Sequence, residues 1–247
     1  MNIIACIFSW KGQYNNTIEL EHQLSKHLPV VVINSDENNT KDHWITLNDS
    51  CYFSDQFKRA ILEFDNKYDA LWHIQSDVSF SNWELILSSA IELYNKYNWG
   101  IYAPNVIDSF YIPSRTDVFE LEKNISVVGT PDCSSWIIHK DFIEEMKKYL
   151  YVMDNNHYGW GFDLLLSAFS HLKARPVIRD YNYTVNHPAS TGYKKREAEE
   201  EMINMILSCP NDIKQVIIDI KQNHKNIINC YGLEQQKQEN IIIYRTC

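Results

Sequence analysis

Short apolar runs alternate with amphipathic segments along the first three-quarters of the chain. Residues 2–10, NIIACIFSW, form a continuous apolar run typical of a buried parallel strand. Leu20, Leu24 and Leu28 then recur at helical spacing, and residues 29–36, PVVVINSD, are β-branched before they turn polar. A strand, a helix and a strand in about forty residues predict a βαβ unit of an open parallel sheet.

The same alternation continues to about residue 188. Apolar periodicity predicts helices at 54–67, 81–97 and 161–174, strands at 68–77, 99–106 and 175–188, and a short strand running into a helix at 132–150. Ser81 and Glu84 have the spacing of a capping box. The polar, aromatic-rich passage 107–129 interrupts the alternation and is predicted to be a loop or excursion.

Two charged amphipathic helices are predicted after Tyr193, at 194–208 and 211–232. No linker rich in Gly, Pro or Ser separates them from the preceding part. We therefore predict an α/β protein with an open, mostly parallel, Rossmann-like sheet flanked by helices, at 1–192, and a helical C-terminal extension packed on it, at 193–247. The mixed charges of this extension favour packing or dimerisation over contact with an anionic lipid surface, which prefers a basic face.

Composition narrows the class of protein. With 45% hydrophobic and 13% aromatic residues, the 247-residue chain can bury a sizeable core. The net charge of −9 argues against a nucleic-acid binder, because no excess of Lys and Arg is available to neutralise phosphates. A single nucleotide held through a cation is compatible with this charge. The six cysteines form no CxxC pair, which excludes a zinc knuckle, and Cys6 is predicted to be a buried thiol.

The N-terminal segment lacks the basic region and long apolar run of a signal peptide, and no segment approaches the length of a membrane span. We therefore expect an intracellular, cytoplasmic protein. A homodimer and a peripheral contact with the inner face of the membrane remain open.

Asp77 is the first candidate for chemistry, because it follows directly on the apolar run of 68–77. Ligands of open α/β sheets bind beyond the carboxyl ends of the strands, and a carboxylate there can hold a hard divalent cation. Asp is also a common turn residue. From position alone, the turn interpretation is favoured.

A second group lies between residues 157 and 188. Gly159 and Gly161 flank Trp160 in a glycine-poor chain, which predicts unusual torsions or close backbone approach. Asp163 follows at the start of a helix, where its carboxylate is either a general base or a residue favoured by the helix dipole. The helical pattern puts four residues on the buried face and two serines on Asp163's side, toward a cleft: Leu164, Leu165, Ala168 and Leu172, and Ser167 and Ser170.

His187 precedes Pro188, which biases it toward extended or turn backbone. A neutral imidazole there can complete a metal shell begun by Asp77. A lone histidine is more often structural, so both interpretations stand.

Taken in chain order, the predicted strands and helices and these candidate residues resemble a nucleotide-sugar glycosyltransferase of the GT-A fold. They are most similar to the family-two-like inverting enzymes. The resemblance covers about three-quarters of the chain, from residue 2 to residue 188. It rests on VVVINSD ending in Asp36, IQSD ending in Asp77 as a DxD-type motif, YGWGFD with Asp163, and VNHP with His187. Two positions depart from the pattern: Gln75 stands where the family usually has the first Asp, and Phe162 where another acid precedes the base.

The resemblance implies an enzyme of the hexosyltransferase type in polysaccharide biosynthesis. It would move a sugar from a nucleoside-diphosphate sugar, with UDP the expected nucleotide, to a hydroxyl of a glycan acceptor. Asp77 and His187 would hold Mn²⁺ or Mg²⁺, and Asp163 would be the catalytic base. Contacts to the nucleotide are implied for Asp36, Lys58, Ser76 and Asp77, and contacts to the acceptor for Tyr158 and Trp160.

Gln75 and the C-terminal helices motivate an alternative from another class. In that alternative the chain is a catalytically weakened GT-A-like module that binds a nucleotide or a partner within a larger glycan-synthesis system. A nucleotidyltransferase is disfavoured, because residues 9–16, SWKGQYNN, contain one Gly and lack a Gly-rich loop after the first strand.

Overall fold

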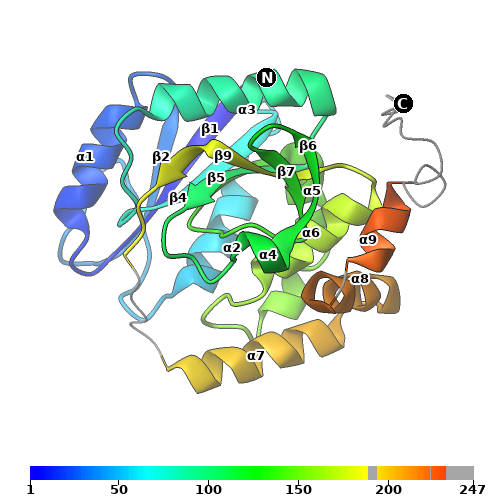
Figure 1. Cartoon of the computed structure of the whole chain (residues 1–247). Coiled ribbons are helices and arrows are strands. Elements are labelled where there is room, and N and C mark those ends of the chain that lie inside the picture. The colour runs from blue at the N-terminus through cyan, green and yellow to red at the C-terminus, as the bar shows by residue number, and fades with distance from the viewer. Residues whose placement is uncertain (189–193, 223, 232–247) are drawn as a thin grey trace.

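A central nine-stranded sheet organises the chain, with helices on both faces (Figure 1). The computed structural model describes residues 1–188, 194–222 and 224–231. The strands are β1 (Ile3–Trp10), β2 (Val30–Ser35), β3 (Ile45–Thr46), β4 (Ala70–Gln75), β5 (Ile101–Val106), β6 (Asp117–Glu122), β7 (Ile125–Val128), β8 (Ser135–His139) and β9 (Val177–Val185). The helices are α1 (Tyr14–Leu24), α2 (Phe53–Glu63), α3 (Trp83–Tyr97), α4 (Pro113–Thr116), α5 (Lys140–Lys147), the 3₁₀ turn Leu150–Met153, α6 (Phe162–Leu172), α7 (Lys195–Ser208), α8 (Asn211–Gln222) and α9 (Lys225–Cys230).

The sheet is mixed and mostly parallel, in the order β3-β2-β1-β4-β8-β5-β9-β7-β6. All of its strands except β7 and β8 run in the same direction. The predicted α/β class with an open, Rossmann-like sheet is therefore confirmed. The carboxyl ends of β1, β2, β4, β5 and β9 meet at one edge, as such sheets require for a binding site.

Side chains of each strand alternate between two apolar layers. On β1, Ala5 and Ile7 pack in the layer covered by α1 and α3, whereas Cys6 and Phe8 pack in the layer covered by α2, α5 and α6. Cys6 is 2% exposed, so the predicted buried thiol is confirmed.

The C-terminal helices complete the second layer. Met205 of α7 and Ile213 and Ile217 of α8 belong to the same apolar cluster as Phe162 and Leu165 of α6. Figure 1 shows α8 and α9 beside α6. The expected boundary at 192/193 and the end of the extension, 232–247, lie outside the described residues.

Three predictions of local structure were wrong. Within 107–129, β6 and β7 form a hairpin, and β7 pairs with β9. The predicted capping box is absent, because α3 starts after Asn82 with no side-chain cap. The helix expected at 211–232 is instead α8 and α9, and His224 between them has a φ of +59°.

The predicted amphipathic character of α6 was also wrong. Ser167 and Ser170 have no exposed surface, because α5, α8 and β9 pack around the helix. Leu172, expected on the buried face, is 41% exposed at the end of the helix. No helix among the described residues is long and apolar enough to cross a bilayer.

Gly159→Ala should destabilise the fold more than Gly12→Ala, although both glycines have a positive φ, +77° and +90°. Left-handed backbone costs an alanine about 1–2 kcal/mol at either position. At Gly159 the new Cβ would also lie 2.4 Å from Phe53 Cδ1, and Phe53 is stacked on Phe57, whereas nothing lies within 4 Å at Gly12. We expect Gly159→Ala to lose a further ~1–3 kcal/mol of unfolding free energy from overpacking. Urea unfolding measures both losses, and equal values would contradict this packing.

Candidate functional site

The carboxyl ends of β4 and β9 are joined although β8 and β5 separate these strands in the sheet. Beyond each strand the chain continues and forms an isolated antiparallel bridge between Ser79 and Asn186. Each of these residues donates its N–H to the other's carbonyl oxygen at 2.9 Å. As a result Asp77 and His187 meet, with His187 Nε2 3.4 Å from Asp77 Oδ1.

The oxygen of Asp77 that faces His187 is buried and accepts no hydrogen bond among the described residues. The same imidazole nitrogen lies 3.1 Å from Gln75 Oε1. Burial disfavours a charge on His187, but Asp77 outweighs it, and the pKa of the imidazole is raised above its ordinary value. Two oxygens and one nitrogen from three side chains thus converge at the end of β4.

No group of three His, Cys, Asp or Glu side chains that could hold a metal occurs in the part of the chain that the structure describes. Asp77 and His187 supply two such groups, and the third neighbour is the neutral amide of Gln75. An amide oxygen is nevertheless a hard ligand of the kind that Mg²⁺ and Mn²⁺ accept.

Asp163 lies in the first turn of α6 and is 3% exposed. Its Oδ2 accepts hydrogen bonds from the hydroxyls of Tyr111, at 2.5 Å, and Thr130, at 3.3 Å. Burial raises the pKa of this carboxyl, and the bond from Tyr111 offsets part of the rise. A buried carboxylate with a raised pKa has the properties of a general base.

Asp132 is a further acid at this edge, and no motif in the sequence pointed to it. It precedes β8, and because β8 runs antiparallel to its neighbours, the start of β8 lies at the carboxyl ends of β4 and β5. Asp132 accepts hydrogen bonds from Ser109 Oγ at 2.6 Å and from the Ser134 N–H at 2.9 Å. Its charge also raises the pKa values of both His187 and Asp163. Asp132 therefore acts electrostatically on both halves of the site.

The residues expected to contact a nucleotide are in different surroundings. Asp36 is 2% exposed, and its carboxylate accepts hydrogen bonds from Asn38 N and Asn39 Nδ2 in its own turn. Ser76 is buried beside Asp77, and its Oγ has no hydrogen-bond partner among the described residues. Lys58 Nζ lies 3.5 Å from Asp154 Oδ1, so the structure does not bring it together with the strand-end group.

Of the residues expected to contact an acceptor, Tyr158 is covered by α7. Tyr158 is 8% exposed and donates its hydroxyl to Glu197 Oε2 at 3.0 Å. Glu201 accepts the backbone N–H groups of His157 and Tyr158 at 2.8 and 3.2 Å. The carbonyl oxygen of Trp160 accepts a hydrogen bond from Asn156 Nδ2 at 2.8 Å. The positive φ values of Gly159 and Gly161 confirm the unusual torsions predicted for this segment.

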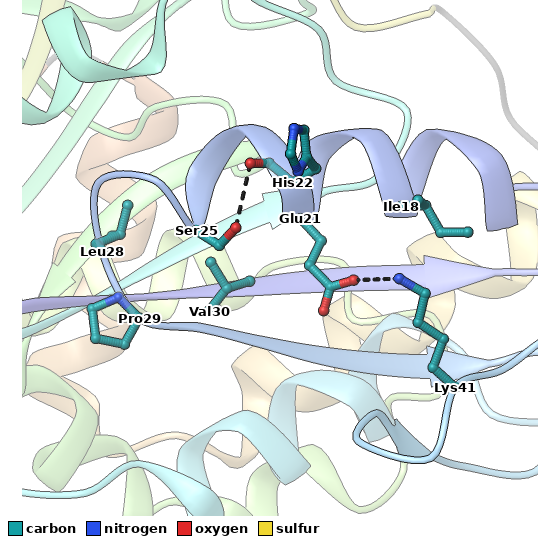
Figure 2. Close-up of a pocket in the computed structure, with 8 residues that line it drawn as sticks. All are labelled: Ile18, Glu21, His22, Ser25, Leu28, Pro29, Val30 and Lys41. Carbon is teal, nitrogen blue, oxygen red and sulfur yellow. Dashed lines mark hydrogen bonds and ion pairs between the residues drawn. The ribbon is translucent and has the colours of Figure 1, made fainter.

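A hollow of about 480 Å³ lies elsewhere, between α1 and the start of β2 (Figure 2). Glu21 of α1 and Lys41 form an ion pair across it, 2.9 Å between Oε2 and Nζ. None of the predicted site residues lines this hollow. The chemistry at the strand ends is separate from it.

The sequence matches no known protein family and no curated protein. Solved GT-A glycosyltransferases are nevertheless similar in structure. S. aureus TarS 1–349 matches over 98% of this chain and 76% of its own, with a TM-score of 0.57 at 10% identity. GalNAc-T7, solved with UDP, GalNAc and Mn²⁺, matches over 97% of this chain and 58% of its own, with a TM-score of 0.62 at 9% identity.

A longer TarS structure matches over 98% of this chain and 46% of its own, with a TM-score of 0.57 at 12% identity. The chain thus spans about half the length of GalNAc-T7 and of the longer TarS. At such identities the likeness concerns the fold. The chain has the GT-A fold of nucleotide-sugar glycosyltransferases.

Proposed function

We propose that this chain is a glycosyltransferase that moves a sugar from a nucleoside-diphosphate sugar to an acceptor hydroxyl, with inversion at the anomeric carbon. The observation that carries the proposal is the pair of Asp77 and His187 at the carboxyl ends of β4 and β9 of a GT-A fold. Asp163, the buried carboxylate at the start of α6, supplies the base. UDP is proposed as the nucleotide because GalNAc-T7 was solved with it.

Asp77 Oδ1 and His187 Nε2 would hold the cation, with Gln75 Oε1 as a neutral neighbour. Asp77 Oδ1 accepts no hydrogen bond among the described residues and lies 3.4 Å from His187 Nε2, so its lone pairs are available to a cation that displaces the proton of the imidazole. When bound, Mn²⁺ or Mg²⁺ stabilises negative charge on a departing nucleoside diphosphate. Mn²⁺ is also the ion in the GalNAc-T7 structure.

Asp163 would take the proton of the acceptor hydroxyl. The acceptor O–H bond breaks as its oxygen forms a bond to the anomeric carbon, and the bond from that carbon to the diphosphate oxygen breaks. The proton ends on Asp163, and the electron pair leaves with the nucleoside diphosphate. A glycan acceptor, a role in polysaccharide synthesis and a cytoplasmic location belong to the same proposal.

A second candidate is a module that binds a nucleotide sugar or a partner without turning it over. Gln75 in place of the usual first acid favours it, because one negative charge fewer at the end of β4 weakens the hold on a divalent cation.

Asp163→Asn should abolish transfer, and Asp77→Asn should reduce it and raise the Mn²⁺ concentration required. General bases contribute about 100-fold or more, so we expect at least that loss for Asp163→Asn. The assay measures transfer and hydrolysis over a panel of nucleotide sugars with Mn²⁺ or Mg²⁺, and calorimetry measures nucleotide binding. Asp42→Asn, an exposed acid outside the site, is the matched control and should keep full activity.

Binding of a nucleotide sugar without transfer by the wild type would favour the second candidate. Absence of nucleotide-sugar binding would overturn the transferase and the nucleotide-binding form of the second candidate.

Asp163→Asn should fold at least as stably as the wild type at neutral pH. Because burial raises its pKa, ionised Asp163 costs stability in the folded state. The stability that the protonated form contributes is present below the ordinary carboxyl pKa and is lost as the pH rises through the raised pKa. Urea unfolding from pH 4 to pH 8 should therefore show the advantage of the variant growing with pH. A variant that is much less stable at pH 8 would contradict this, and its inactivity would then be uninformative.

A further inference from the structure

Two hydroxyls converge on the same oxygen of Asp163. Tyr111 comes from the loop after β5, and Thr130 from the segment after β7, and both contact Oδ2. Thr130 is further fixed by Ser167 Oγ at 3.2 Å, one helical turn beyond Asp163 on α6. Together with the backbone hydrogen bonds at Asp163 and Leu164, these contacts restrict the rotation of the Asp163 carboxylate.

One guanidinium holds both hydroxyl-bearing residues by their backbone. Arg179 of β9 is 2% exposed, and it donates from Nη1 to the carbonyl oxygen of Tyr111 at 2.9 Å and from Nη2 to that of Thr130 at 3.5 Å. The same Nη1 also lies 3.0 Å from Thr116 Oγ1. The planar fork of an arginine thus sets two loops in a fixed relation to Asp163.

The loop that carries Tyr111 is fixed from its other side as well. Ser109 Oγ accepts the Tyr111 N–H at 3.1 Å and donates to Asp132 Oδ2 at 2.6 Å. Burial and the nearby Asp163 raise the pKa of the Tyr111 hydroxyl well above its ordinary value. Tyr111 therefore keeps its proton and remains a hydrogen-bond donor.

We propose that Tyr111 is the positioning residue of the base, and that Arg179 holds Tyr111 and Thr130 in place for that purpose. The inference rests on the proposed function, in which Asp163 takes the acceptor's proton. Tyr111 itself exchanges no proton in the reaction. It holds Oδ2 and thereby orients the carboxylate toward the acceptor, and its hydrogen bond favours the ionised form that a base requires.

Tyr111→Phe removes the hydroxyl and leaves the backbone contacts to Ser109 and Arg179. We expect kcat to fall about 10-fold, the KM for the nucleotide sugar to stay unchanged, and the acid limb of the pH–rate profile to move upward by about one pH unit. The direction follows because the lost hydrogen bond stabilised the carboxylate. The ionisable groups that face Asp163 are Tyr111, Asp132 and Cys133, and only the first is changed.

Tyr181→Phe is the matched control. Tyr181 also accepts from Arg179 Nη1, at 3.3 Å, but it donates to Asp117 at 2.6 Å and not to Asp163. The kcat of Tyr181→Phe and the acid limb of its pH–rate profile should equal those of the wild type. Carboxyl ¹³C NMR of aspartate-labelled protein measures the Asp163 titration independently of activity. The midpoint of that titration should move to higher pH in Tyr111→Phe and not in Tyr181→Phe.

An Asp163 titration or a pH–rate profile that is the same in Tyr111→Phe as in the wild type overturns this inference. So does an equal change in Tyr181→Phe. Activity that survives Asp163→Asn overturns the proposed function instead.

Discussion

The site depends on one pair of backbone hydrogen bonds, those between Ser79 and Asn186. Neighbouring strands lie about 4.8 Å apart, so β4 and β9, with β8 and β5 between them, are about 14 Å apart in the sheet. Asp77 and His187 could not interact across that distance. The register of β9 against β5 shifts between Pro104 and Asn105, and the end of β9 pairs with Asn105 and Val106 in the new register. The bridge beyond the strand ends then closes the gap, and the pair of acid and imidazole exists only because of it.

The base side of the site is organised differently, through buried polar groups. Asp163, Arg179 and the hydroxyls of Tyr111 and Thr130 are removed from water, and burial of such groups is costly unless each finds a partner. Here the guanidinium fixes the backbone of the two residues whose hydroxyls meet the carboxylate. Three segments far apart in sequence, the loop after β5, the segment after β7 and the start of α6, are thereby held in one arrangement. The charge of Asp132 raises the pKa values of both Asp163 and His187, so the two halves share an electrostatic environment.

The C-terminal helices contribute to both core and site. Met205 packs into the cluster formed by α6, and Glu197 and Glu201 hold the segment that contains Tyr158. The predicted C-terminal extension is therefore part of what fixes the proposed acceptor side.

The fold class and most strands and helices follow from hydrophobic periodicity, because that signal is local and strong before residue 107 and after residue 132. The hairpin of β6 and β7 does not, because β6 is half-exposed and β7 is a buried run of only four residues that joins the sheet by pairing with β9.

By itself the sequence determined which residue types stand at the strand ends, the order of the motifs, and hence the GT-A fold and the candidates Asp77, Asp163 and His187. The sequence also showed that Gln75 replaces the first Asp of the DxD-type motif, because a single residue type is read directly from the sequence. The tertiary structure decided which of these residues meet. Asp132 entered the site only because β8 runs antiparallel, and strand direction is set by pairing between distant segments. Tyr111 contacts Asp163 across 52 residues of chain and Arg179 across 68, and no local pattern encodes these contacts. Local periodicity fixes elements, whereas the site arises from long-range hydrogen bonds between them.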